Sequence, residues 1–195
     1  MLQTPRLRVI RWLALPLLAC VAASAAVVAP VKTESQRASL DDVEAAYLYN
    51  FGKFVRWPEA AAGTPLVICI AGSDSFQEAV AHLVGDERIG GRDVQTRRVE
   101  SRAAIPACSI LFVDAEESDR LGTYLAAADG KPVLTVSDAP DFLDRGGIIQ
   151  FVFDGDHVRF SVNLSAAGHN GLTLSSELLK VAVHVTGSQG RGGPR

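Results

Sequence analysis

Residues 65–83 read PLVICIAGSDSFQEAVAHL. The first seven residues form a continuous apolar run rich in Val and Ile, which is typical of a β-strand that is buried on both faces. Gly72 interrupts the run, and Ser73 or Asp74 is suited to cap a helix that we expect over residues 75–83. A buried strand followed directly by a helix is the repeating unit of a parallel α/β sheet, so this stretch indicates the fold class.

The same unit recurs further along the chain. Residues 108–114 (CSILFVD) and 132–136 (PVLTV) are two more buried strands, and a helix fits residues 116–128 between them. After the third strand, Ser137-Asp138 is expected to cap a short helix with Pro140 in its first turn. Buried strands that alternate with helices predict a single α/β domain with a mostly parallel central sheet and helices on both faces.

Two further segments predict strands of a different kind. Polar residues interrupt the apolar ones in residues 94–99, which favours an exposed or edge strand. Residues 147–162 contain two β-rich runs around Asp154-Gly155-Asp156, and an Asp-Gly pair between such runs is typical of a tight hairpin. We therefore expect a late antiparallel hairpin at an edge of the sheet, then a turn or short helix from Asn163, and a last helix over residues 174–185.

The first 25 residues have the composition of a secretory signal peptide, with three arginines before an apolar run and small residues after it. Ala23-Ser24-Ala25 fits ordinary cleavage, whereas the lipobox-like Leu17-Leu18-Ala19-Cys20 would make Cys20 a lipidated N-terminus, and both routes stay open. Either route predicts a periplasmic protein without a transmembrane segment in its mature chain. The remainder is expected to divide into a linker (26–38), the domain (39–186) and a disordered tail (187–195).

The charge of the mature chain excludes two classes of partner. Without residues 1–25 the chain carries 16 Lys and Arg against 22 Asp and Glu, a net charge of −6. Nucleic-acid binding and electrostatic attachment to an anionic membrane both require a basic footprint, so neither is expected.

The chain shows no pattern typical of a catalytic or metal site. It has no G-x-S-x-G elbow, and no two of its four histidines have the i, i+3 or i+4 spacing of metal ligands. We therefore expect no enzymatic activity, no metal and no cofactor. Ligands of open α/β sheets bind at the carboxyl ends of the strands, so the alternative function is a small-metabolite-binding protein with a crevice lined by Ser73 and Ser137.

Cys69 and Cys108 are the cysteines that remain once the signal peptide is removed. In an oxidising compartment two cysteines favour one disulfide over two buried thiols. The link would close a loop of about 40 residues and, in the chain-entropy model, stabilise the domain by about 4 kcal/mol. Two roles stay open, a structural staple and a redox-sensitive link.

Residues 47–58 (YLYNFGKFVRWP) are expected to end a first helix over residues 39–56, which Trp57-Pro58 terminates. Tyr49, Lys53 and Arg56 face outward and are predicted to meet a partner. Asn50 lies on the opposite, apolar face, where burial would require hydrogen-bond partners, so it is expected to tether the helix to another element. Steps of three and four place the following apolar residues on that buried face: Val43, Ala46, Tyr47, Phe51, Phe54 and Trp57.

Three blocks of the sequence resemble the YfiR-like family of exported bacterial proteins. The segment YLYNFGKFVRWP is similar to the family pattern Y-x-x-N-F-x-K-F-x-x-W-P, and the strands VICIAG and CSILFV carry Cys69 and Cys108. Residues 133–182 match the elements S-D, G-G-x-I-x-F, V-x-F-x-x-N and L-x-S-x-L-L-x-x-A. The resemblance covers about residues 40–183. Its signature positions here are Asn50, Phe51, Lys53, Phe54, Trp57 and Asn163.

The resemblance implies a function that the residues alone do not show. Characterised members are periplasmic repressors that bind the periplasmic sensor region of an inner-membrane diguanylate cyclase, lower cyclic-di-GMP and limit biofilm formation, and they are not enzymes. They are suspected of responding to redox state through disulfides, and some carry a second cysteine pair near the late hairpin. This chain lacks that pair, so only the Cys69–Cys108 link is carried over. The identity of the cyclase and a homodimeric state stay open.

Overall fold

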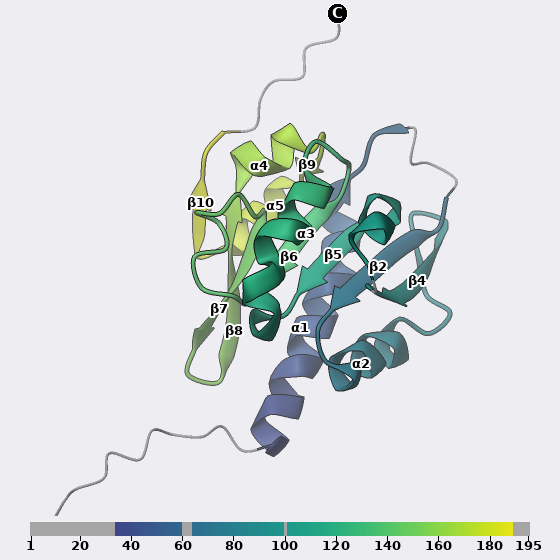
Figure 1. Cartoon of the computed structure of the whole chain (residues 1–195), viewed down its shortest axis with the longest axis vertical. Helices are drawn as coiled ribbons and strands as arrows, with labels where there is room; N and C mark the ends of the chain where they lie inside the picture. Colours follow the sequence, from purple (N-terminus) through teal and green to yellow (C-terminus); the bar gives the residue numbers. More distant parts are fainter. Residues whose placement is uncertain (1–33, 60–63, 100, 189–195) are drawn as a thin grey trace, which may run out of the picture. The chain divides into compact units, whose positions relative to one another are not determined.

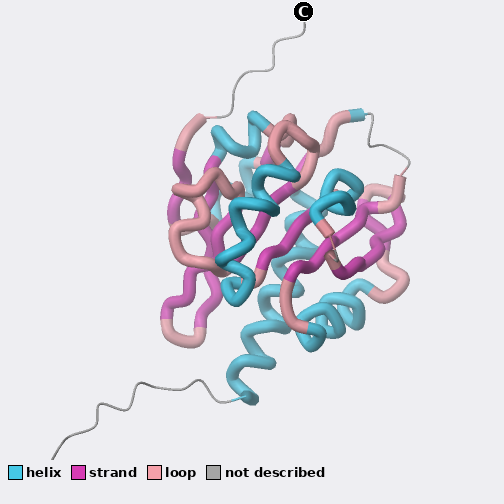
Figure 2. Tube along the Cα trace, viewed as in Figure 1, coloured by secondary structure: helices cyan, strands magenta, loops and turns pink. Residues whose placement is uncertain are grey.

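The computed structural model describes residues 34–59, 64–99 and 101–188. The predicted signal peptide, the lipidation of Cys20 and most of the predicted tail lie outside the described residues. None of the helices in the described segments combines the length and the hydropathy of a transmembrane span. These segments form one α/β domain, whose elements are labelled in Figure 1 and coloured by type in Figure 2.

A central sheet with the strand order β10-β8-β7-β6-β5-β2-β4-β3 runs through the domain. Its middle strands are β2 (Leu66–Ala71), β5 (Ile110–Val113) and β6 (Leu134–Ser137), which pair in parallel and are buried along their whole length. The parallel part continues with β4 (Arg92–Arg98) beyond β2 and with β7 (Ile149–Asp154) beyond β6. The structure therefore confirms the mostly parallel sheet and its three buried strands.

Antiparallel pairs flank this parallel centre. β3 (Arg88–Ile89) pairs with β4, and β8 (His157–Asn163) pairs with β7 around the two-residue turn Gly155-Asp156. The predicted hairpin is confirmed. Its predicted place at the edge of the sheet is wrong, because β10 (His184–Thr186) adds a parallel strand beyond β8.

Helices cover both faces of the sheet (Figure 1). α1 (Glu34–Phe54) and α2 (Asp74–Val84) pack on one face, and the 3₁₀ helix η2 (Arg102–Ala107) and α3 (Leu121–Ala128) pack on the other. A separate hydrophobic core lies on each face of the sheet. Because successive side chains of a strand point to opposite faces, each buried strand contributes residues to both cores. In β2 the first core receives Leu66, Ile68 and Ile70, and the second receives Val67, Cys69 and Ala71.

Polar side chains cap three of the described helices. Ser73, Asn163 and Ser175 each accept a backbone hydrogen bond in the first turn of α2, α4 (Leu164–His169) and α5 (Ser176–Val181), at 3.2, 3.0 and 3.3 Å. Each bond satisfies a donor that the helix itself leaves unpaired.

The last predicted helix is too long. A helix was expected over residues 174–185, but α5 ends at Val181, and Ala182 is extended (φ −67°, ψ 139°). Val183 then donates its backbone N–H to Phe160 O at 2.9 Å, and β10 follows. The valines that alternate along this segment suit the open edge of β8, because β-branched side chains are favoured in strands.

The short helix predicted after Ser137-Asp138 is wrong, since residues 139–146 form bends and turns. Asp141 has a positive φ of 60°, which lies outside the right-handed helical region. Asp138 caps a different element instead. Its Oδ1 accepts a hydrogen bond from Ala115 N at 2.7 Å, at the start of the 3₁₀ helix η3 (Ala115–Arg120).

The surroundings of Asp138 change its acidity. Burial, with the nearby charge of Asp114 as the second cause, raises the pKa of the Asp138 carboxyl to about 6. The hydrogen bond from Ala115 N, which by itself lowers the pKa, is outweighed. The folded protein therefore holds this proton more tightly than the unfolded chain does. The proton's contribution to stability is complete below about pH 4 and is lost as the pH rises through about 6.

The first helix begins inside the segment predicted as a linker (26–38) and buries another face than the one expected. Asn50 is exposed and Phe54 is 39% exposed, so their predicted burial and the tethering role of Asn50 are wrong. The prediction placed the aromatic residues on the buried face. In the structure, the buried face is instead formed by residues spaced three and four apart that begin at Leu40. The buried positions of this segment from residue 40 onward are Leu40, Glu44, Ala45, Leu48, Phe51, Gly52 and Val55.

Phe51 is buried as predicted and joins α1 to the late hairpin. Its ring centroid lies 5.1 Å from that of Phe160 and 6.0 Å from that of Phe151. Tyr47, which is half-buried, adds a ring contact with Phe51 at 5.8 Å and donates a hydrogen bond to Val158 O at 3.2 Å. Aromatic packing therefore fixes the middle of α1 on the sheet.

Cys69 and Cys108 form the predicted disulfide, with Cα atoms 5.7 Å apart. The bond links β2 to the residue that ends η2, and both cysteines are buried in the core that α3 covers. Because 39 positions separate them, the bond closes a long loop that includes α2, β3 and β4.

We expect the double variant Cys69→Ser/Cys108→Ser to lose up to about 4 kcal/mol of unfolding free energy, because the unfolded chain regains the entropy of the closed loop. Urea denaturation of the oxidised protein and the variant measures the loss. The wild type unfolded in excess reductant is the control and should approach the variant. Equal midpoints for the oxidised protein and the variant would contradict a stabilising link.

We also expect Asp138→Asn to remove the pH dependence that this carboxyl confers. Asn keeps an oxygen for the Ala115 N–H but does not ionise. From about pH 5 to 7.5, the wild type should therefore lose about 1 kcal/mol of unfolding free energy relative to the variant. Urea denaturation at both pH values measures this. A parallel pH dependence in the two proteins would show that Asp138 titrates at its ordinary pKa.

Candidate functional site

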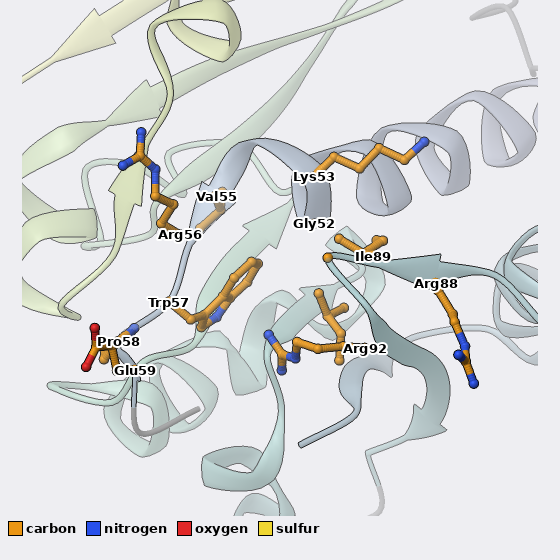
Figure 3. Close-up of a pocket in the computed structure, with 12 residues that line it drawn as sticks. Gly52, Lys53, Val55, Arg56, Trp57, Pro58, Glu59, Arg88, Ile89 and Arg92 are labelled. Carbon is orange, nitrogen blue, oxygen red and sulfur yellow. The ribbon is translucent and has the colours of Figure 1, made fainter. Parts of the chain in front are cut away.

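An open groove of about 580 Å³ lies beside the end of α1 (Figure 3). One wall is formed by the end of α1 and the residues that follow it, including β1 (Val55–Arg56). β1 pairs with β9 (Thr173–Leu174). The other wall is the turn between β3 and β4, and Leu66 contributes from the start of β2. The groove thus lies at the amino ends of the parallel strands. The ligand crevice predicted from the sequence was placed at the opposite, carboxyl ends. We call it the β1–β3 groove. Its lining residues are Gly52, Lys53, Val55, Arg56, Trp57, Pro58, Glu59, Leu66, Arg88, Ile89, Gly90 and Arg92.

A glycine on α1 allows the two walls to meet. A Cβ added at Gly52 would lie 2.7 Å from Ile89 Cδ1 and 3.4 Å from Leu66 Cδ1. A side chain at this position would therefore force the end of the Ile89 side chain to move away from the helix. The turn on the opposite wall also depends on glycine, because Gly90 and Gly91 both have positive φ (58° and 80°), as the tightest hairpin turns require.

Trp57 and Arg92 form the centre of the groove (Figure 3). Trp57 is half-buried, and its Nε1 donates a hydrogen bond to Ser109 O at 3.3 Å. The Arg92 guanidinium lies 5.8 Å from the centroid of the indole ring, within the range of a cation–π contact. The two side chains therefore form one amphipathic surface, apolar on the indole and cationic on the guanidinium.

Arg92 is fixed by neutral oxygens. Its Nε donates to Thr64 O at 2.7 Å, and its NH2 group donates to Pro65 O at 3.2 Å and to Ser109 Oγ at 3.3 Å. Partial burial lowers the pKa of the Arg92 guanidinium, although it stays charged at any physiological pH. These three contacts hold the guanidinium in place without neutralising it.

The groove is more basic than the protein around it. Its lining includes the cations Lys53, Arg56, Arg88 and Arg92 and the single carboxylate of Glu59. Of the four cations, Arg88 is paired with Asp93 at 2.7 Å. Such a local surplus on a chain of net charge −3 favours an anionic partner at this face.

The three residues predicted to meet a partner lie at or beside the groove. Lys53 and Arg56 are exposed and line it, as expected from their outward position. Tyr49 is half-buried, and its hydroxyl donates to Glu87 Oε2 at 2.6 Å, which raises the pKa of Tyr49. The Lys53 ammonium lies 4.0 Å from the Tyr49 ring centroid. Contact of these residues with a partner stays a prediction.

The other signature positions have structural surroundings of their own. Trp57, predicted on the buried face, lines the groove, whereas exposed Asn50 and Phe54 do not. Asn163 caps α4 and also donates its side-chain amide to Leu143 O at 3.4 Å. Its position therefore has a clear structural reason.

The crevice predicted at the carboxyl ends of the strands is only partly accessible. Ser137 is completely buried, and its hydroxyl accepts from Ala139 N at 3.0 Å, so it does not reach a surface. Ser73 is half-buried and caps α2. The neighbouring Asp114 and Asp138 make this edge acidic. Ligand binding at Ser73 stays a prediction.

Ser109 and Arg92 were not among the site residues predicted from the sequence. Ser109 follows the cysteine of a predicted strand, and nothing in its neighbours marks it. The position of Arg92 could have been predicted, because Gly90-Gly91 between Ile89 and Arg92 is a favoured two-residue hairpin loop. The strand before this loop is only two residues long, so the sequence did not indicate a hairpin. Among the described residues, no group of three or more His, Cys, Asp or Glu could hold a metal ion.

Two solved structures show partial similarity of fold. One is a crystal structure of a conserved domain protein from Vibrio cholerae O1 biovar El Tor str. N16961, with a TM-score of 0.50 and 10% identity over 75% of this chain. The chain spans 60% of the length of that protein. The other is the ABC domain in complex with L-Trp from Streptococcus pneumonia, with a TM-score of 0.44 and 14% identity, covering 63% of this chain and 55% of that one. The first supports the α/β fold, and the second is too distant to support an argument.

A protein family matches far more specifically. Residues 41–183, which include every strand of the central sheet except β10, match the family described as YfiR/HmsC-like. The matched segment extends from the first helix to the end of α5 and takes in the aromatic helix end, both cysteines and the late hairpin. The chain therefore belongs to the YfiR/HmsC-like family.

Proposed function

We propose that the protein binds and represses the periplasmic sensor region of an inner-membrane diguanylate cyclase, and thereby lowers cyclic-di-GMP and biofilm formation. The observation that carries the proposal is the family match over residues 41–183. Membership supports a periplasmic regulator of diguanylate cyclases at the level of the family. The particular cyclase is part of the proposal, as is export through the N-terminal segment.

The surface around the end of α1 suits such a contact. Lys53, Phe54 and Arg56 are all exposed, and Phe54 is 39% exposed although it is a large apolar side chain. Aromatic and arginine side chains contribute most to protein interfaces, because they combine a large contact area with directional hydrogen bonds. We assign the contact to these three residues and to the adjoining β1–β3 groove.

The proposed activity requires no chemistry on a substrate. A repressor acts by binding one state of its target more tightly than the other. We therefore propose that the protein is not an enzyme and uses neither metal nor cofactor.

Deleting the gene should raise cellular cyclic-di-GMP, and the double variant Lys53→Glu/Arg56→Glu should raise it toward the deletion level. Reversing two interface charges typically weakens binding by roughly ten-fold or more. The matched control is Arg102→Glu/Lys131→Glu, which makes the same charge change at exposed residues of η2 and of the turn after α3.

The readouts are cyclic-di-GMP measured by mass spectrometry and, for both variants, the urea midpoint as a check on folding. The control variant should repress like the wild type. An unchanged nucleotide level after deletion would contradict the proposed function. Full repression by the folded Lys53→Glu/Arg56→Glu protein would place the contact elsewhere.

A further inference from the structure

The cations of the β1–β3 groove do not converge on one point. Figure 3 shows the ends of the Lys53, Arg56 and Arg88 side chains directed away from one another, at the rim, while Arg92 lies in the middle beside Trp57. A compact anion such as phosphate is bound where several donors converge on it. Cations spread along two walls instead suit negative charges that are themselves spread along a chain.

The middle of the groove offers one fixed positive charge. Three neutral oxygens hold Arg92, and none of the described acidic side chains forms an ion pair with it. Partial burial has removed some of its hydration, as the lowered pKa of the guanidinium indicates. An incoming carboxylate would therefore gain a charge-assisted hydrogen bond to a donor that is already oriented.

Apolar surface adjoins that charge. The Trp57 indole, Ile89 and Val55 all line the groove (Figure 3), and Trp57 is partly open to solvent. The hydrogen bond from Trp57 Nε1 to Ser109 O fixes the plane of the ring. A rigid indole beside a fixed guanidinium is suited to an apolar side chain whose neighbour in sequence is acidic.

We propose that the β1–β3 groove binds an extended acidic segment of a partner protein, with an aromatic or aliphatic side chain packed on Trp57 and a neighbouring carboxylate paired with Arg92. The remaining carboxylates of the segment lie near Lys53 and Arg56 at the rim. The inference rests on the proposed function only for the identity of the partner. The chemistry of the segment follows from the charge and shape of the groove.

Trp57 provides a direct readout. The chain contains two tryptophans, Trp12 and Trp57, so the full chain with Trp12→Phe reports only on the groove. The probe is a seven-residue blocked peptide of Asp, Glu and Phe, titrated with excitation that Phe does not absorb. A matched peptide replaces each Asp by Asn and each Glu by Gln, and inorganic phosphate serves as the compact anion.

We expect the acidic peptide to cause a saturable change in Trp57 emission that weakens as salt is added, and the neutral peptide to bind roughly ten-fold more weakly or not at all. Arg92→Gln should weaken binding of the acidic peptide by roughly ten-fold, and Arg92→Lys, which keeps the charge but not the planar fork, by less. Arg97→Gln is the control, because Arg97 is exposed on the same strand but does not line the groove. It should bind like the wild type.

Three results would overturn the inference. They are no saturable change with the acidic peptide, equal affinity for the neutral peptide, and competition by phosphate at the same concentration as the peptide. The two peptides are compared on a chain with an unaltered groove, so the test stands even if Arg92→Gln does not fold. Loss of peptide binding in folded Arg92→Gln with repression of the cyclase intact would overturn the assignment of the groove to that partner. An unchanged cyclic-di-GMP level after gene deletion, with peptide binding intact, would remove the proposed function and leave the acidic-segment site standing.

Discussion

Ser109, which follows the disulfide-bonded Cys108, is the residue that connects the central sheet to the groove. Its N–H donates to Val67 O at 2.8 Å and its carbonyl accepts from Leu134 N at 2.9 Å, so it joins β2 and β6 at the start of β5. The same carbonyl accepts from Trp57 Nε1, and the hydroxyl accepts from Val67 N and from Arg92, each at 3.3 Å. Ser109 is only 8% exposed, so removing its hydroxyl would take the acceptor from the buried Val67 N–H, at a cost of about 1–3 kcal/mol.

Buried contacts hold the walls of the groove in position. Cys108, the residue before Ser109, is bonded covalently to Cys69 of β2, and Gly52 brings α1 close to Ile89 of β3. The parts that would bind a partner are therefore positioned by buried structure, although the groove itself is open. Preorganised surfaces of this kind lose less conformational entropy on binding, which raises the affinity that a given contact area provides.

The sequence predicted the elements whose evidence is local. β2, β5 and β6 are continuous apolar runs, the late hairpin has turn residues between two β-rich runs, and two cysteines lie outside the predicted signal peptide. It did not predict β10, because Val183 and its neighbours follow a helix and become a strand only when the edge of β8 is present. The buried face of α1 was wrong for a related reason, since Val43 and Phe54 are apolar yet exposed. Trp57, Arg92 and Ser109 meet only through the strand order β5-β2-β4, which no local pattern encodes.

The proposed contact joins the face around the end of α1 to a diguanylate cyclase. Photo-crosslinking in living cells tests it most directly, with benzoylphenylalanine in place of Arg56 at the groove or of Lys131 on the α3 side. We expect irradiation to link the protein to an inner-membrane protein with a diguanylate cyclase domain from position 56 and not from position 131. Cross-links to that cyclase from position 131 alone, or cross-links from position 56 only to unrelated proteins, would contradict it.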